Sequence, residues 1–260
     1  MTQSPYETYC KWNVKDPLAE KGFVVAADLT QEWLLPWWWE KYKEHNNAPV
    51  AFIDLGLSQE MKRWCKERGH YIHLPVADLF VSGKENFPSK KAKDLEKEFG
   101  ERIWISRNAW FKKPLACLQS PFKKSVWMDL DCEVKDNLND IFSLPLIPTS
   151  IAVIKEHLPG KDPNVNSGVI LFEKDAAILE DWARESLANN VSYPGDQDVL
   201  YALILKNKPP LTDLPPIYNW SRLNNDNPEA LVIHWHGNHG KVVINHQWQR
   251  SQMEKEGLLF

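Results

Sequence analysis

The sequence predicts an α/β protein in which crossover helices connect the strands of a parallel sheet. The first observation is that apolar runs alternate with amphipathic segments near the start of the chain, in the order strand, helix, strand, helix, strand. Each amphipathic segment supplies the crossover that a pair of parallel strands requires. The second observation is a short buried run, 126–128, that ends in two carboxylates, as strands do where they reach a binding site.

The first part of the chain predicts three strands and two helices. Thr30 is expected to cap a helix that runs to about residue 43, and Ser58 to cap a helix that Gly69 ends. The strands are expected at 22–27, 49–55 and 71–76.

A lysine-rich segment, 89–99, predicts a solvated helix or loop. Residues 108–120 are expected to be helical after Pro114 and to lead into the acidic strand. The remaining expected elements are a turn at 138–142, strands at 150–155, 164–173 and 231–236, and helices at 176–187 and 195–205. The strand at 231–236 is expected to close the sheet and to precede a loop that contains Gly237 and Gly240, whereas the tail from residue 247 has too weak a periodicity to assign.

The composition is that of an ordinary globular protein. The 260 residues are 43% hydrophobic and 25% charged, and the net charge of -4 argues against nucleic acid as a partner. The four scattered cysteines indicate a reducing compartment and no cysteine zinc site. No signal peptide or membrane-length apolar run is visible, so we expect a cytoplasmic protein, with a peripheral membrane location as the alternative.

Asp129 and Asp131 are the first candidate site residues. Side chains alternate along a strand, so these two acids are expected to face the same side. Two neighbouring carboxylates repel each other unless a positive charge lies between them, and a divalent cation meets that need. Such a pair also arises by chance, as in 196–198, and two solvated acids in a turn remain the alternative.

Several polar positions are expected to meet at one edge of the sheet. Asp28, Asp129, Asp131 and the loop after His236 all follow predicted strands. Ligands of open α/β sheets bind outside the carboxyl ends of the strands. The sequence therefore predicts a binding site at this edge.

With these motifs in this order, the chain resembles GT-A glycosyltransferases, most closely glycosyltransferase family 8, the group of glycogenin and the lipopolysaccharide galactosyltransferases. The resemblance covers about 22–244 and implies a mostly parallel central sheet flanked by helices. It implies one GT-A domain over 1–260, with a nucleotide-sugar-binding half at 21–131, an acceptor and catalytic half at 132–245, and a polar tail at 246–260. The motifs that carry it are 26–28 (Ala-Ala-Asp), 127–131 (Trp-Met-Asp-Leu-Asp), 166–169 (Asn-Ser-Gly-Val), 196–198 (Asp-Gln-Asp) and 234–237 (His-Trp-His-Gly).

The resemblance implies that Asp129, Asp131 and His234 bind a divalent metal, Mn²⁺ or Mg²⁺. A metal that bridges both phosphates neutralises the charge that develops when a sugar leaves a nucleoside diphosphate. An imidazole beside carboxylates favours manganese. For His234, a half-buried histidine at a strand end is the alternative.

The resemblance also implies the donor-binding residues, among which Asp28 contacts the nucleoside. Lys112 is placed where the family has a basic residue that reaches the phosphates, with Lys113 as the alternative. Two loops depart from the family pattern: Asp28 lacks the usual aromatic partner two or three residues later, and Lys241 lies one residue later than the phosphate lysine. The full donor-binding set is Ala26, Ala27, Asp28, Lys112, Asp129, Leu130, Asp131, Gly237 and Lys241.

Asn166, Asp196 and Gln197 are the candidate catalytic residues that the resemblance implies. Gln197 can stabilise an oxocarbenium-like centre through its carbonyl, and Asp196 can hold sugar hydroxyls. An acidic helix N-terminus is the alternative for 196–198.

The function implied is that of a metal-dependent retaining glycosyltransferase. It would move a hexose from a UDP-sugar to an unidentified acceptor, which is a glycan, a lipid-linked sugar or a protein. A sugar nucleotidyltransferase and a non-catalytic sugar-nucleotide-binding protein are the alternatives. The first of these usually has a glycine-rich loop after the first strand, and residues 28–31 contain no glycine.

Overall fold

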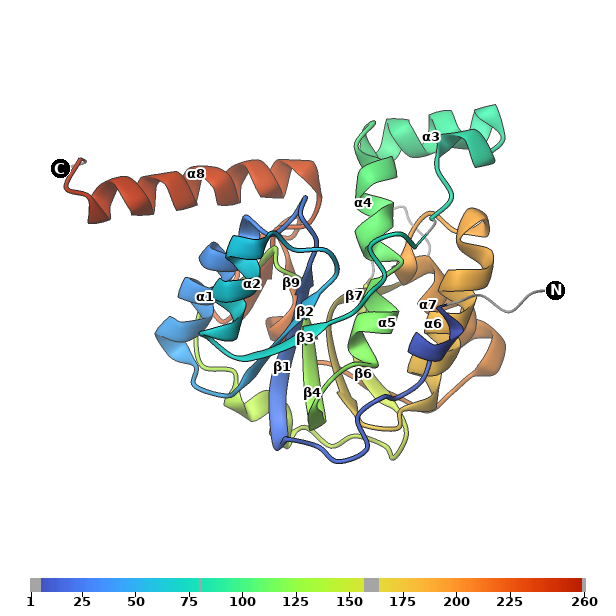
Figure 1. The fold of residues 1–260 in the computed structure, drawn as a ribbon, viewed down its shortest axis with the longest axis horizontal. Coiled ribbons are helices and arrows are strands. Elements are labelled where there is room, and N and C mark those ends of the chain that lie inside the picture. Colours follow the sequence, from blue (N-terminus) through green and yellow to red (C-terminus); the bar gives the residue numbers. More distant parts are fainter. Residues whose placement is uncertain (1–5, 80, 157–163, 259–260) are drawn as a thin grey trace.

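The computed structural model describes residues 6–79, 81–156 and 164–258. A seven-stranded sheet has the order β3-β2-β1-β4-β7-β6-β8, and a three-stranded sheet has the order β5-β10-β9. Helices cover both faces of the large sheet: α1 and α2 lie on one face, and α5, α6 and α7 lie on the other (Figure 1).

The strands are β1 (Ala19–Ala27), β2 (Val50–Asp54), β3 (His70–His73), β4 (Phe122–Met128), β5 (Cys132–Val134), β6 (Ile151–Glu156), β7 (Asn164–Glu173), β8 (Leu211–Asp213), β9 (Trp220–Ser221) and β10 (Val232–His234). The α-helices are α1 (Leu34–His45), α2 (Gln59–Lys66), α3 (Ser89–Phe99), α4 (Ile103–Trp110), α5 (Lys113–Cys117), α6 (Ala177–Asn189), α7 (Asp196–Asn207) and α8 (Gly237–Lys255).

The first part of the chain confirms the predicted parallel sheet. β1 pairs in parallel with β2 and with β4, and β2 pairs in parallel with β3. β1 is buried on both faces because Phe23 and Val25 join one hydrophobic cluster and Val24 joins the other. Ser58 caps α2 as predicted, since its side chain accepts a hydrogen bond from the Met61 amide at 3.2 Å.

The prediction that Thr30 caps α1 was wrong. The amide and the hydroxyl of Thr30 both donate to the Asp28 carboxylate, at 2.9 and 2.6 Å, so this residue closes a turn of its own. The helix consequently begins later, at Leu34.

The second half adds antiparallel pairs to the large sheet. β7 runs antiparallel to both β4 and β6, and β6 pairs in parallel with β8. The prediction that residues 231–236 close the large sheet was wrong, because β10 pairs with β5 and β9 instead. The cause is the turn at residues 129–131, which carries the chain out of the large sheet before β5 begins.

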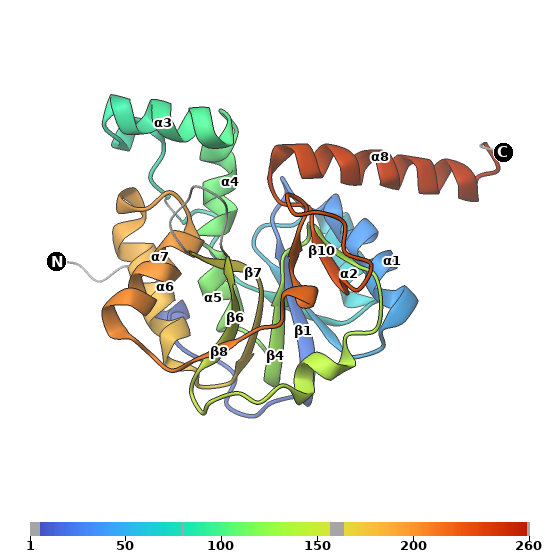
Figure 2. The same cartoon turned by 180° about the vertical axis from the view of Figure 1, so that it is seen from behind.

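The expected loop around Gly237 and Gly240 is the start of the 19-residue helix α8, which extends through the unassigned tail and projects from one end of the sheet (Figures 1 and 2). A Cβ atom on Gly240 would lie 1.7 Å from the Trp235 carbonyl oxygen, so glycine here permits the helix to pack closely against the segment before it. Only Gly240 and Ile244 of α8 are buried, which explains the weak hydrophobic periodicity. Residues 259–260 of the tail lie outside the described residues.

Candidate active site

The two acids lie in the turn that joins β4 to β5, not in the strand itself. The Asp129 amide donates to the Gly168 carbonyl of β7 at 2.8 Å, and the Trp235 amide donates to the Asp131 carbonyl at 2.9 Å. The turn is therefore held between the large sheet and the segment that follows β10. The expectation of strand alternation does not apply to these residues, although both acids still reach one site.

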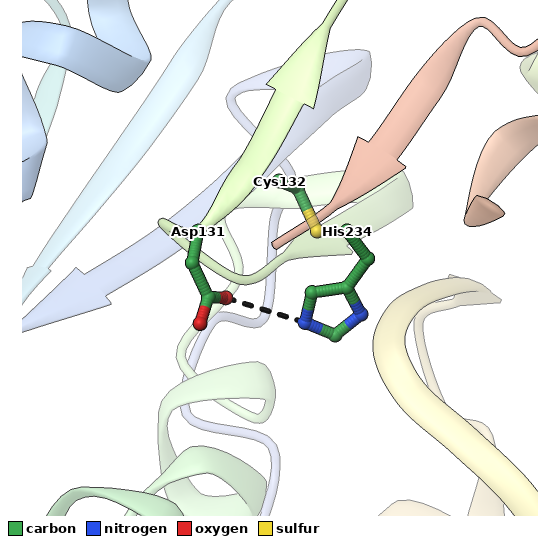
Figure 3. A group of neighbouring side chains, drawn as sticks. All are labelled: Asp131, Cys132 and His234. Atoms are coloured by element: carbon green, nitrogen blue, oxygen red, sulfur yellow. Dashed lines mark ion pairs between the residues drawn. The ribbon is translucent and has the colours of Figure 1, made fainter. Parts of the chain in front are cut away.

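The structure brings Asp129, Asp131 and His234 together. The Nε2 atom of His234 lies 3.2 Å from Oδ1 of Asp131 (Figure 3). The same nitrogen lies 3.9 Å from Oδ2 of Asp129. The His234 and Asp131 side chains are 6% and 10% exposed. Two segments about a hundred residues apart thus form one buried polar centre.

A chain of hydrogen bonds fixes the tautomer of His234. The Gly168 amide donates to Oδ1 of Asn166 at 2.9 Å, and Nδ2 of Asn219 donates to the same oxygen at 2.9 Å. Oδ1 of Asn219 therefore faces Nδ1 of His234, 2.9 Å away, as an acceptor. Nδ1 therefore carries a proton, and Nε2 is the ring nitrogen that faces Asp131.

A lone pair on Nε2 would repel the Asp131 oxygen that it faces. A positive charge, either a proton or a metal ion, is therefore required between the two atoms. The ligand atoms of Asp131, Cys132 and His234 all lie within 4.8 Å of one another, which is close enough for one cation. The carboxylate and imidazole donors, with Asp129 beside them, fit a divalent ion such as Mn²⁺.

Cys132 was not among the predicted site residues. Its sulfur lies near the ring of His234 because the two residues are direct partners in the β5–β10 pairing (Figure 3). Burial raises the pKa of its thiol well above the ordinary value. Knowledge of the strand register would have revealed it, but the sequence alone does not give that register.

The structure favours Lys113 over Lys112 as the basic residue of the site. Nζ of Lys113 lies 3.0 Å from Oδ2 of Asp129 and 3.3 Å from Oδ2 of Asp196. Burial alone would lower the pKa of Lys113, but these two carboxylates raise it. Lys112 instead donates to the Ala77 carbonyl at 3.1 Å, since consecutive residues of a helical segment point in different directions.

Lys241 forms an ion pair with Asp131. Its Nζ lies 2.7 Å from Oδ2 of Asp131, at the first turn of α8. Burial by itself would raise the pKa of Asp131, but Lys241 and His234 lower it well below the ordinary value. His236 forms a hydrogen bond with Ser221 at 2.8 Å, and burial lowers its pKa to about 4.

The N-terminus of α7 contributes Asp196 and Gln197. Oδ2 of Asp196 accepts from the Ser167 hydroxyl at 3.0 Å, and Oε1 of Gln197 accepts from the Ser167 amide at 3.2 Å. Asp198 caps the helix through the Gly195 amide at 2.9 Å, so capping does not account for Asp196. Burial and Asp129 raise the pKa of Asp196, whereas Lys113 lowers it, and the net shift is upward.

A pocket opens at the carboxyl ends of β1 and β4, where binding sites of α/β sheets lie. Asp28 lines this pocket, and its carboxylate accepts the hydrogen bond from the Thr30 hydroxyl. Gly237 lies outside the lining at a φ of +81°, where an L-residue would be strained. The lining residues are Ala26, Ala27, Asp28, Gln31, Leu55, Ala109, Trp110, Lys113, Trp127, Asp129, Leu130, Asp131 and Lys241.

Solved structures that resemble this chain include several glycosyltransferases. The galactosyltransferase LgtC, solved with donor and acceptor sugar analogues, is 14% identical over 92% of this chain and 100% of its own, with a TM-score of 0.55. GlyE from Streptococcus pneumoniae TIGR4 is 15% identical over 89% of this chain, with a TM-score of 0.53, and the chain spans 65% of the GlyE length. Mouse xyloside xylosyltransferase 1 is 13% identical over 84% of this chain and 97% of its own, with a TM-score of 0.52.

No family model matches the sequence, and no curated protein sequence matches it. In the part of the chain that the structure describes, no helix combines the length and apolar composition needed to cross a membrane. The mixed sheet, its flanking helices and the solved structures together show that the chain has the GT-A glycosyltransferase fold.

Proposed function

We propose that this protein is a metal-dependent retaining glycosyltransferase, similar to family 8, that transfers a hexose from a UDP-sugar to an acceptor. The observation that carries the proposal is the convergence of Asp129, Asp131 and His234 beside a pocket at the carboxyl ends of β1 and β4. Two lysines, Lys113 and Lys241, line the same pocket. Acids, an imidazole and lysines together suit a metal-bound diphosphate.

Asp129, Asp131 and His234 would hold Mn²⁺ or Mg²⁺. When bound, the ion neutralises negative charge on the departing diphosphate. The protonated Nδ1 of His234, held by Asn219, leaves Nε2 available as a ligand. In this proposal, Asn166 acts on the metal site through Asn219, in addition to the sugar contact expected of it.

The donor would lie across the pocket, with its nucleoside at Ala26, Ala27 and Asp28. Lys241 would contact the phosphates and Gly237 would allow the backbone to approach them. Nζ of Lys113, bound between Asp129 and Asp196, would link the metal centre to the sugar end of the site. Leu130 lines the pocket and would contact the donor.

Asp196 and Gln197 would face the sugar. Lys113 balances the charge of Asp196, which makes that carboxylate a weak nucleophile and suits it to binding sugar hydroxyls. The side-chain oxygen of Gln197 can stabilise positive charge at the anomeric carbon. The acceptor, whether a glycan, a lipid-linked sugar or a protein, would approach beside the leaving group. We propose that this chemistry takes place in the cytoplasm.

Calorimetry with UDP and Mn²⁺ tests the metal role. We expect UDP to bind in a metal-dependent manner, and Asp129→Ala or Asp131→Ala to weaken the binding by about a hundredfold, since each removes a charged ligand. Asp213→Ala is the matched control, because that carboxylate is exposed and pairs only with Lys155 among its described contacts. Unchanged UDP affinity in both site variants would contradict the proposal.

A panel of UDP-sugars, incubated with the protein and Mn²⁺, tests the enzymatic role. Slow release of UDP in the absence of an acceptor is the expected result, as water replaces the acceptor. Tight binding with no UDP release from any donor would indicate a sugar-nucleotide-binding protein. Pyrophosphate release from UTP and a sugar phosphate would indicate a nucleotidyltransferase.

A further inference from the structure

Both carboxylate oxygens of Asp131 already have partners within the chain. Oδ1 faces Nε2 of His234 at 3.2 Å, and Oδ2 accepts from Nζ of Lys241 at 2.7 Å. The Asp131 side chain is 10% exposed, so water screens this ion pair weakly. A cation that approaches Asp131 must therefore compete with a positive charge that is already in place.

The two lysines of the pocket differ in how firmly they are held. Nζ of Lys113 contacts Asp129, Asp196 and the Ser167 hydroxyl, and its side chain is 7% exposed. Its departure would leave two carboxylates without their partner, at a high free-energy cost. The Lys241 side chain is 30% exposed, and its departure uncovers one carboxylate. Lys241 is thus the lysine that can change partners.

We propose that Lys241 acts as an internal counter-ion that neutralises the Asp131 carboxylate through Oδ2 until a nucleoside diphosphate draws its ammonium group away. The inference rests on the proposed function. Lys241 and Asp131 line the same pocket, so a diphosphate bound there lies within reach of the lysine side chain. The diphosphate offers several charged oxygens, and the Asp131 carboxylate then keeps its full negative charge for the metal.

This exchange makes the metal and the nucleotide bind with positive coupling. Metal alone binds weakly because Lys241 already neutralises Asp131 and repels a second cation, and nucleotide removes that cost. A lysine that only binds phosphate behaves differently, since its removal weakens nucleotide binding without strengthening metal binding. The sign of the change in metal affinity therefore distinguishes the two roles.

Titration of the full-length protein with Mn²⁺, followed by the electron paramagnetic resonance signal of the free ion, measures metal affinity without any catalysis. In Lys241→Met we expect Mn²⁺ alone to bind about tenfold more tightly than in the wild type, because a nearby positive charge is lost. Added UDP should strengthen Mn²⁺ binding in the wild type and much less in the variant.

Lys241→Arg and Lys255→Met are the controls. The first keeps a positive charge beside Asp131 and should retain the weak metal-only affinity. The second removes a lysine of the same helix that pairs with Glu40, and should also leave metal affinity unchanged. Metal-only affinity that is equal or weaker in Lys241→Met overturns the inference while the proposed function stands. If the wild type binds no Mn²⁺ even with UDP, the metal role fails, and this inference fails with it.

Discussion

At the scale of single residues, Asp54 shows how the fold keeps a charge buried beside the pocket. It ends β2, next to Leu55 of the pocket lining, and its side chain is fully buried. Burial by itself would raise the pKa of Asp54, but hydrogen bonds to the carboxylate lower it to about 2. The partners are the amides of Leu57 and Gly56 at 2.6 and 2.8 Å, the Tyr71 hydroxyl at 2.5 Å, His73 at 3.0 Å and Lys62 at 3.3 Å.

Asp54→Asn should destabilise the protein in a pH-dependent way. A carboxylate whose pKa is lowered from its ordinary value of 3.8 to about 2 in the folded state stabilises the fold at any pH above the ordinary value. That contribution, roughly 2 kcal/mol, is lost as the pH falls from about 4 toward 2. Urea unfolding should show a difference in the free energy of unfolding between wild type and variant that is constant near neutral pH and shrinks below about pH 4.

Exposed Asp175→Asn is the comparison, because that carboxylate pairs only with neighbouring Lys174 among its described contacts. If the difference in the free energy of unfolding between the wild type and Asp54→Asn stays constant down to pH 2, the buried charge does not have the role assigned to it.

The candidate site shows how far sequence reasoning reaches for single residues. Asp129 and Asp131 follow an apolar run, so the local pattern predicted their position at a strand end. The choice between Lys112 and Lys113 depends on the direction of each side chain at the start of α5, where Lys112 is the N-cap residue and Lys113 the first helical residue. Cys132 depends on its pairing with His234, a contact across about a hundred residues. Local patterns carry no information about either.

At the scale of elements, Arg107 ties α4 to the segment that leads into α7. Its guanidinium is fully buried and donates to the carbonyls of Asn190, Tyr193 and Pro194, just before Asp196. It lies 4.8 Å from the ring centroid of Phe87 and 4.7 Å from that of Phe111. Burial lowers the pKa of Arg107 to about 10, which leaves it charged at neutral pH.

Arg107→Lys should loosen the start of α7. Lysine keeps the charge but lacks the planar guanidinium group that donates to three carbonyls at once. We therefore expect the free energy of unfolding to fall by about 2 kcal/mol. Amide hydrogen exchange should become faster in residues 190–197. Exposed Arg102→Lys at the start of the same helix is the control. Exchange that rises elsewhere, with 190–197 unchanged, would show that the arginine does not hold this segment.

Elements that carry strong local signals were predicted well, and those that depend on distant partners were not. The segment 89–99 forms a helix with those bounds, and β7 has the predicted bounds of 164–173. Residues 231–236 read as a strand, but the sheet they join depends on where β5 turns away from β4. α8 was missed because only Gly240 and Ile244 of the helix are buried, so its sequence carries no apolar stripe.

At the scale of the whole molecule, the candidate site is a junction between the two sheets. Asp129 follows β4 of the large sheet, His234 belongs to β10 of the small sheet, and Lys241 belongs to α8. The predicted GT-A fold is confirmed by solved structures of low sequence identity, so the fold is shared although few residues are identical. A ligand that contacts all three elements would bind the folded chain and not the unfolded one.

UDP and Mn²⁺ together should therefore raise the melting temperature. At ligand concentrations about a hundred times the dissociation constant, binding adds about 2.7 kcal/mol to the free energy of unfolding. For a chain of this size, that corresponds to an increase of roughly 5–10 °C in a thermal scan. EDTA should reverse the increase, and His234→Ala should lose it, because the variant removes the only proposed metal ligand from the small sheet. An equal increase from UDP in the presence of EDTA would show that the nucleotide binds without a metal, through the lysines alone.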